Sequence, residues 1–184
     1  AGHWGSEEQG LNGSRAYALD HPADVEKLQA LFNQDNGTGR ITSMGAGGLM
    51  NAGGHLARWL SRIPTEITRD IRVQFPGMPA GGGTDNASFA PAGVPAFGLG
   101  AINWDYFSYT WHTNRDTYDK LVFDELKNNV ALVACLVYLA SEDPDLISRE
   151  RRVMPADKTK GTPQPWPEGS VPNRDGSPRQ RTRE

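Results

Sequence analysis

Three acidic residues and one histidine stand at positions where this sequence could do chemistry. Glu7 and Glu8 are neighbours in the stretch WGSEEQGLNGSRAY. Asp35 follows the apolar run LFNQ, and His112 lies in the aromatic stretch YTWHTNRDTYDKL. Carboxylate and imidazole groups are ligands that zinc accepts in proteins. A metal would also explain the adjacent glutamates, because one carboxylate can bind the cation while its neighbour takes a proton from water.

Each of these residues also has an ordinary structural explanation. The glutamate pair can be a solvated helix start that the helix dipole favours. Asp35, in the stretch DNG, can be a turn residue, and His112 can be a hydrogen-bonded loop histidine. The other histidines are weaker candidates, because they fall on a predicted strand, in a turn before proline and on a helix face: His3, His21 and His55. Residue types alone therefore leave both interpretations open.

Composition narrows the class of protein. The 184 residues suffice for one ordinary domain. A net charge of -3 and a pI of about 5.8 give no basic surface, which argues against nucleic acid as a partner. The single cysteine, Cys135, excludes a disulfide framework and is expected to be a small core residue. No apolar run is long enough to span a membrane.

Short apolar runs alternate with helical patterns along the chain. We predict strands at AGHW, at the end of ALFNQ, in GRITSM, near residues 71–75 and at AGVPAFGLGAI. An amphipathic helix is expected to bury Leu56, Trp59, Leu60 and Ile63, and a further helix is expected to start near Thr84 or Asp85. This alternation predicts an α/β fold with a largely parallel sheet, whose strand ends form a ligand crevice.

The strongest helical pattern is FDELKNNVALVACLVYLASEDP. Its apolar positions predict a mostly buried helix, with Val130, Leu132, Val133, Leu136, Val137 and Leu139 inside. Beyond Arg149 the chain is rich in Pro, Gly, Lys and Arg, and cannot bury enough surface to fold alone. We therefore predict a domain over residues 1–148 and an extended tail over 149–184, ordered only where it lies along the body or a partner.

Four motifs in a fixed order carry a resemblance to a known family. The stretches EEQGLNGS, DNGTG, TDNASFAPAGVPA and HTNRDT are similar to those of the co-catalytic zinc exopeptidases, metallopeptidase family 28. That family includes bacterial leucyl-type aminopeptidases and the glutamate carboxypeptidase and carboxypeptidase Q group. The resemblance covers roughly residues 1–143. It implies a three-layer α/β/α sandwich with a mostly parallel central sheet, here without its N-terminal strands.

The resemblance implies a role for each of the four residues. Glu7 matches the general base, which activates water and passes the proton to the leaving amine. Glu8 and His112 match the ligands of one zinc ion, and Asp35 matches a ligand of the second. An aspartate at position 35, rather than a glutamate, resembles the aminopeptidase-like branches. The implied substrate is a peptide or amino-acyl compound, and the implied location is secreted or periplasmic.

Further residues are pocket candidates with open alternatives. Asp116 and Thr117 are placed to hold the His112 loop or to stabilise a turn. Asp85 either lines the pocket or caps its helix. Aromatic residues of the same loop form a specificity wall, support an oxyanion or simply pack together: Tyr106, Phe107, Tyr109 and Trp111. Asn86 departs from the family, because many relatives carry histidine there.

The main departure from the family lies before the double glutamate. The family places a histidine and a zinc-bridging aspartate there, and these 184 residues begin at AGHW, which we interpret as a cut made inside a domain. We therefore expect an incomplete zinc shell, no peptidase activity of this chain alone, and an unprotected sheet edge. That edge or the tail is a candidate oligomer contact. Two alternatives stay open: a metal-free binding or scaffold domain, and an acyl-transfer enzyme of the glutaminyl-cyclase type.

Overall fold

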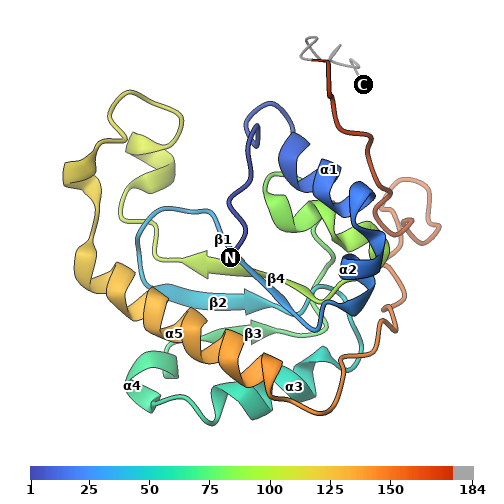
Figure 1. The fold of residues 1–184 in the computed structure, drawn as a ribbon, viewed down its shortest axis with the longest axis horizontal. Coiled ribbons are helices and arrows are strands. Elements are labelled where there is room, and N and C mark those ends of the chain that lie inside the picture. The colour runs from blue at the N-terminus through green and yellow to red at the C-terminus, as the bar shows by residue number, and fades with distance from the viewer. Residues whose placement is uncertain (176–184) are drawn as a thin grey trace.

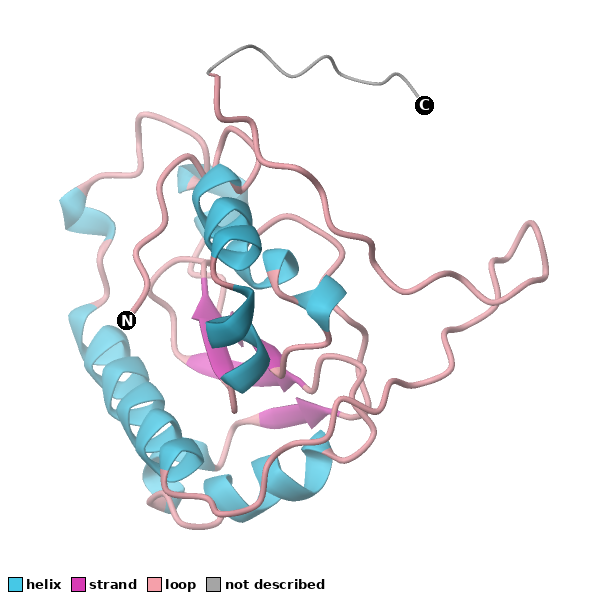
Figure 2. Ribbon diagram, turned by 45° about the vertical axis from the view of Figure 1, so that its right-hand side comes forward, coloured by secondary structure: helices cyan, strands magenta, loops and turns pink. Residues whose placement is uncertain are grey.

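A four-stranded sheet organises the protein, whose structure is a computed structural model that describes residues 1–175 (Figures 1 and 2). The strands are β1 (Leu31–Gln34), β2 (Ile41–Gly45), β3 (Arg72–Gln74) and β4 (Ala96–Ala101). Their order across the sheet is β1-β4-β2-β3. The pairs β1–β4 and β2–β3 are parallel, and β2–β4 is antiparallel. The predicted α/β fold with a mostly parallel sheet is confirmed.

The helical segments connect and flank these strands. The α-helices are α1 (Asn12–Asp20), α2 (Pro22–Lys27), α3 (Ala52–Leu60), α4 (Thr65–Thr68) and α5 (Phe123–Ser141). The shorter 3₁₀ and π turns are η1 (Asp85–Ser88), η2 (Ala90–Ala92), η3 (Tyr106–Thr110) and η4 (Tyr118–Lys120). No helix between residues 1 and 175 combines the length and the apolar character that a membrane crossing requires.

The main core lies between the sheet and the helices α3 and α5. Its fully buried members come from both strands and helices, and include Ile41, Met44, Phe97, Leu56, Trp59, Leu132 and Leu136. Asn129 of α5 lies inside this core with its polar atoms satisfied. Its amide oxygen accepts from the backbone N–H of Ile41 at 2.9 Å, and its amide nitrogen donates to the carbonyl of Gly39 at 2.8 Å. A buried amide with both partners fixes α5 against the start of β2.

A second, smaller cluster packs on the opposite face of the sheet. Ala96 belongs to it, whereas its neighbour Phe97 belongs to the main core, as the alternation of side chains along a strand requires. The other buried members are Val25, Phe89 and Val94. Helical segments therefore lie on both faces of the sheet, with α3 and α5 on one side and α2 with the segment around η1 on the other (Figure 1).

Three sequence-based expectations about the elements are wrong. Residues 1–4, expected as a strand, pair with no strand of the described chain. Instead, Trp4 packs on the rings of Tyr17 and Phe89, at centroid distances of 5.1 and 5.8 Å. The helix expected from Thr84 or Asp85 is only the 3₁₀ turn η1, because Pro91 lacks an N–H and its ring would clash with a continuing helix.

The third error concerns how much of α5 is buried. Val130 and Val137 are 61% and 53% exposed, while Leu132, Leu136 and Leu139 are buried. Two residues seven positions apart share one side of a helix, so these valines lie together on the side that faces away from the core. The helix α5 is thus amphipathic, although its sequence reads as almost uniformly apolar.

The described part of the tail lies along the body of the protein. The Arg149 guanidinium donates hydrogen bonds to three backbone carbonyls, those of Val25, Glu26 and Ala92. The Trp166 indole donates to the carbonyl of Ala90 at 2.8 Å, and the Arg151 guanidinium lies 4.7 Å from its ring centroid. The remaining positions of the predicted tail, 176–184, lie outside the described residues.

Candidate metal centre

The Glu7–Glu8 pair lies in a tight turn that precedes α1. The Glu7 carbonyl accepts hydrogen bonds from the N–H groups of Gly10 and Leu11, both at 2.8 Å. The turn folds back onto α1, where a Cβ at Gly13 would lie 2.5 Å from the carbonyl oxygen of Gly5. Because α1 begins at Asn12, the two glutamates stand outside its first turn. The interpretation of the pair as an ordinary helix start therefore does not apply.

Two non-glycine residues at this site hold left-handed backbone conformations. Ser6, just before the glutamates, has a φ angle of 57°, and so has His112. Residues with a Cβ avoid this region because of steric crowding. Such outliers persist only where surrounding contacts hold them, and they are concentrated at functional sites.

Asp35 follows the last residue of β1. The parallel register pairs Gln34 with Leu99 of β4. The side-chain amide nitrogen of Asn36 donates a hydrogen bond to the Leu99 carbonyl at 2.7 Å. These contacts fix the backbone on both sides of Asp35. The carboxylate thus stands at the carboxyl end of a strand, where open α/β sheets place their ligands.

Glu8 and His112 meet although they are far apart in the sequence. The Nε2 atom of His112 lies 3.1 Å from the Oε2 atom of Glu8, and the two side chains are 52% and 62% exposed. The His112 ring stacks on the ring of Trp111 at a centroid distance of 4.1 Å. With zinc bonds of about 2.1 Å, two ligand atoms of a tetrahedral site stand roughly 3.4 Å apart. The observed separation therefore suits two ligands of one ion.

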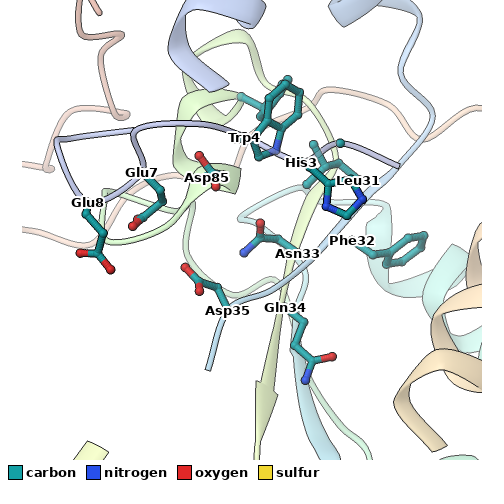
Figure 3. A pocket seen from close by; sticks show the side chains of 12 residues that line it. His3, Trp4, Glu7, Glu8, Leu31, Phe32, Asn33, Gln34, Asp35 and Asp85 are labelled. Carbon is teal, nitrogen blue, oxygen red and sulfur yellow. The ribbon is translucent and has the colours of Figure 1, made fainter. Parts of the chain in front are cut away.

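A cavity of about 500 Å³ opens beside these residues. Figure 3 shows Glu7, Asp35 and Asp85 pointing toward the same space from three different segments, while Glu8 points outward. Trp4 and Phe89 form part of its apolar wall. The cavity thus joins the site residues that lie far apart in the sequence.

Two carboxyl groups in this cavity, those of Glu7 and Asp85, have pKa values above their ordinary ones. Burial raises the pKa of Glu7 above its ordinary value, and the charges of Asp35, Glu8 and Asp85 raise it further, while His112 opposes the shift. Burial also raises the pKa of Asp85, against a hydrogen bond from Ser14 and with help from the Asp35 charge. Carboxyl groups with raised pKa values in a cleft are typical of catalytic and binding sites.

The donor set fits part of a zinc site. Between residues 1 and 175, no group of three or more His, Cys, Asp or Glu side chains converges closely enough to hold a metal ion. What converges is the pair Glu8 and His112, with Asp35 at the cavity beside it. A catalytic zinc usually takes three protein ligands. Among the described residues, Glu8 and His112 thus bring together two donors of the types that zinc accepts, at a spacing that suits one ion.

The remaining predicted site residues fall into two groups. Asp85 lines the cavity and makes no side-chain cap on η1, which favours its interpretation as a pocket residue. Thr117 donates to the carboxylate of Asp119 at 2.6 Å, and in the described chain neither Thr117 nor Asp116 bonds to the His112 ring. Tyr109 and Trp111 are about half exposed beside the pair, with the Arg115 guanidinium 4.8 Å from the Tyr109 ring.

Sequence reasoning missed two residues that shape the cavity. Asn33 lines it, and its amide donates to the Thr84 hydroxyl at 2.9 Å, which joins β1 to the loop before η1. Asn33 stands two positions before Asp35, and residues so spaced on a strand share a face. That spacing was available as a signal. Ser14, whose hydroxyl lowers the pKa of Asp85 against the effect of burial, is fully buried in α1 and has no comparable pattern around it.

Comparisons with known proteins identify the family of this chain. The family model for peptidase family M28 matches residues 2–137, more than half of the chain. Carboxypeptidase Q from Mus musculus is 28% identical over 148 residues, which cover 79% of this chain and 30% of that protein.

Two solved structures resemble the fold. A peptidase M28 precursor from Shewanella amazonensis SB2B superposes with a TM-score of 0.64 at 27% identity, over 84% of this chain and 33% of that one. The LapA aminopeptidase of Legionella pneumophila gives a TM-score of 0.56 at 17% identity, over 77% and 38%, and bears on the fold alone. This chain spans less than two fifths of each of these relatives. By the extent of the family match, the chain belongs to peptidase family M28.

Proposed function

We propose that this chain is part of a zinc-dependent exopeptidase that removes residues from the amino terminus of peptides. The observation that carries the proposal is the pair of Glu8 and His112 at 3.1 Å, with Glu7 beside it in an acidic cavity. Membership of peptidase family M28 supports hydrolysis of peptide bonds.

Each residue has a distinct part in the proposed reaction. Glu8 and His112 would hold one zinc ion, and Asp35 would be a ligand of a second. When bound, zinc would act as a Lewis acid that polarises the scissile carbonyl and makes water more acidic. The Glu7 carboxylate takes the proton from that water and delivers it to the departing amine.

The charge of the cavity favours an aminopeptidase over a carboxypeptidase. A carboxypeptidase must hold the terminal carboxylate of its substrate, and Arg or Lys is the usual partner for that group. Among the described residues that line the cavity there is no Arg and no Lys, whereas four carboxylates line it: Glu7, Glu8, Asp35 and Asp85. In the absence of bound metal, a terminal ammonium group therefore finds a favourable environment there, and a terminal carboxylate finds no cationic partner.

The test measures hydrolysis of L-leucine 4-nitroanilide by the full-length gene product that carries this sequence. We expect turnover that a chelator abolishes and added zinc restores. Turnover that persists in the presence of the chelator, or a purified protein that binds no zinc, would contradict the proposal. A purified protein that binds no zinc would favour a metal-free binding domain. The observation behind this alternative is that no three metal-binding side chains converge between residues 1 and 175.

The isolated 184-residue chain gives a separate prediction. Because its described residues bring only two ligands together, we expect weak zinc binding and no detectable turnover from it. Chelator-sensitive hydrolysis by this chain alone would show that the expectation of an incomplete shell is wrong.

A further inference from the structure

The long helix α5 carries two rows of side chains on opposite sides. The inward row is buried in the main core and includes Leu132, Leu136 and Leu139. Steps of four and three residues keep side chains on one side of a helix, and two helices pair along their length with this spacing. The outward row repeats with alternating steps of four and three, and all its members are exposed: Phe123, Lys127, Val130, Ala134, Val137 and Ser141. We call these six residues the outward seam.

The outward seam is apolar at its centre. Val130 and Val137 are more than half exposed, and so is Tyr138 beside them. Ala134 lies between the two valines and has no side chain beyond its Cβ, so the axis of another helix can approach closely there. Single apolar residues are common on protein surfaces, whereas a continuous exposed apolar patch marks a contact with another protein. The centre of the seam thus has the composition of a helix-pairing surface.

The charges at the two ends of the seam differ in sign. Lys127 lies near the start of α5, and its ion pair with Asp124 is exposed and contributes little. Glu142 directly follows the last residue of α5 and is exposed. In a parallel pair of these helices, Lys127 would face Lys127 and Glu142 would face Glu142. In an antiparallel pair, Lys127 of each copy lies beside Glu142 of the other, at the negative end of that helix dipole. The charges therefore favour an antiparallel pair.

We propose that a second copy of this protein docks on the outward seam, with the two α5 helices antiparallel and a two-fold axis beside Ala134. In that arrangement Val130 of each copy meets Val137 of the other. Such a two-fold contact uses the same patch on both copies and is the commonest kind of oligomer contact. The seam is a different surface from the sheet edge and the tail. None of its residues lines the cavity of the candidate metal centre, so the contact is independent of the proposed peptidase activity.

The size of the contact predicts a dimer in equilibrium with its monomer. Stable interfaces bury about 1,200–2,000 Å² in total. One helix from each copy supplies the centre of this contact, and Figure 2 shows that helix along one border of the molecule. At each end, the exposed rings of Phe123 and Tyr118 widen it, with their centroids 5.6 Å apart. A contact built from these parts stands at the low end of that range, where association depends on concentration.

The test is sedimentation equilibrium of the full-length gene product that carries this sequence, at several protein concentrations and at low salt. We expect an equilibrium between monomer and dimer. Val137→Glu should raise the dissociation constant at least about tenfold, because each dimer would then bury two unpaired carboxylates. Val153→Glu is the matched control and should leave the constant unchanged, because Val153 is also an exposed valine but lies on the tail.

Charge reversal tests the orientation of the two helices. Lys127→Glu and Glu142→Lys should each raise the dissociation constant about threefold or more, because each change places like charges beside one another. The double variant should regain the affinity of the unaltered protein, because opposite charges then face each other again. In a parallel pair each residue faces its own copy, so reversal leaves like charges together and neither the weakening nor the rescue occurs.

Three results would overturn the inference: a monomer at every concentration, a dimer that Val137→Glu leaves unchanged, or a double charge variant that fails to regain affinity. A monomer would mean that water or another segment of the full-length protein covers the seam. The measurement on the unaltered protein and the charge variants decides the matter even if Val137→Glu fails to fold, which circular dichroism would show.

Discussion

The Nε2 atom of His112 lies 3.1 Å from the Oε2 atom of Glu8, although more than half of the chain separates the two residues in sequence. Both side chains are about half exposed, and an exposed ion pair of this kind contributes little to stability, about 0–1 kcal/mol. Stability therefore gives little reason for the contact. Two metal-binding groups held at the spacing of a ligand pair explain it better.

Removal of either member of this pair should weaken zinc binding. In the full-length gene product, we expect Glu8→Ala and His112→Ala each to lower zinc affinity at least about tenfold, because loss of a direct ligand exceeds the effect of losing its supporting contacts. His21→Ala is the matched control, since His21 is exposed and lies near Asp24, outside the cavity. Competition with a chromophoric chelator measures the affinity. Unchanged binding in both ligand variants would remove the pair from the metal site.

Glu7 should be needed for turnover and dispensable for metal binding. We expect Glu7→Gln to lower kcat by about 10²–10⁴-fold, the usual contribution of a general base, with zinc content near that of the unaltered protein. Turnover of L-leucine 4-nitroanilide and metal analysis of the same sample check both halves. If Glu7→Gln loses zinc while Glu8→Gln keeps it, the two glutamates have exchanged roles.

Asp85 should make the metal-free chain less stable as the pH rises. Burial raises its pKa above the ordinary 3.8, so the folded state binds this proton more tightly than the unfolded state. The resulting stabilisation is complete below about pH 3.8 and is lost as the pH rises through the raised pKa. We therefore expect Asp85→Asn to unfold at higher urea than the unaltered chain at pH 7, and the difference to shrink toward pH 3.5.

Equal urea midpoints of the two proteins at pH 7 would contradict this account of Asp85.

The tail should stabilise the body through Trp166. Trp166→Ala removes the indole hydrogen bond to Ala90 and the contact with Arg151, and we expect it to lower the free energy of unfolding by about 2 kcal/mol. Val153→Ala is the control, because Val153 is 82% exposed on the same segment. Urea unfolding gives the energies. Equal effects of the two substitutions would show that the tail contacts contribute nothing specific.

Local sequence patterns predicted the helices and strands whose formation depends mainly on residues close together in the sequence. The amphipathic helix with Trp59, the buried strand ending at Ala101 and the long helix through Leu136 all form where periodicity places them. Burial along α5 was predicted less well. An apolar residue such as Val137 does not indicate which side of the helix packs against the sheet. The individual contacts of the tail were not predicted either. They join arginine side chains to backbone carbonyls, and because every residue has a carbonyl, the sequence does not indicate which one is bound.

The candidate site was likewise predictable from the sequence only in part. The types of Glu7, Glu8 and His112 suggested metal chemistry, but only the resemblance assigned a shared ligand role to Glu8 and His112, since no local pattern reports a contact over such a distance. Asp85 was expected to be either a cap or a pocket residue. The structure places it in the lining of the cavity beside residues of distant segments, which the sequence around it cannot show. The roles assigned to these residues stay predictions until the variants are measured.

The left-handed backbone at Ser6 and His112 bears on how this protein can evolve. Each such residue costs about 1–3 kcal/mol, and here one stands beside the glutamates and the other is itself a candidate ligand. A glycine at position 6 would remove the conformational cost at that residue. It would also make the turn that positions Glu7 and Glu8 more flexible. Selection for heat resistance alone would then favour the relaxed turn and erode the site. At these two positions, a substitution that raised stability would thus be expected to lower activity.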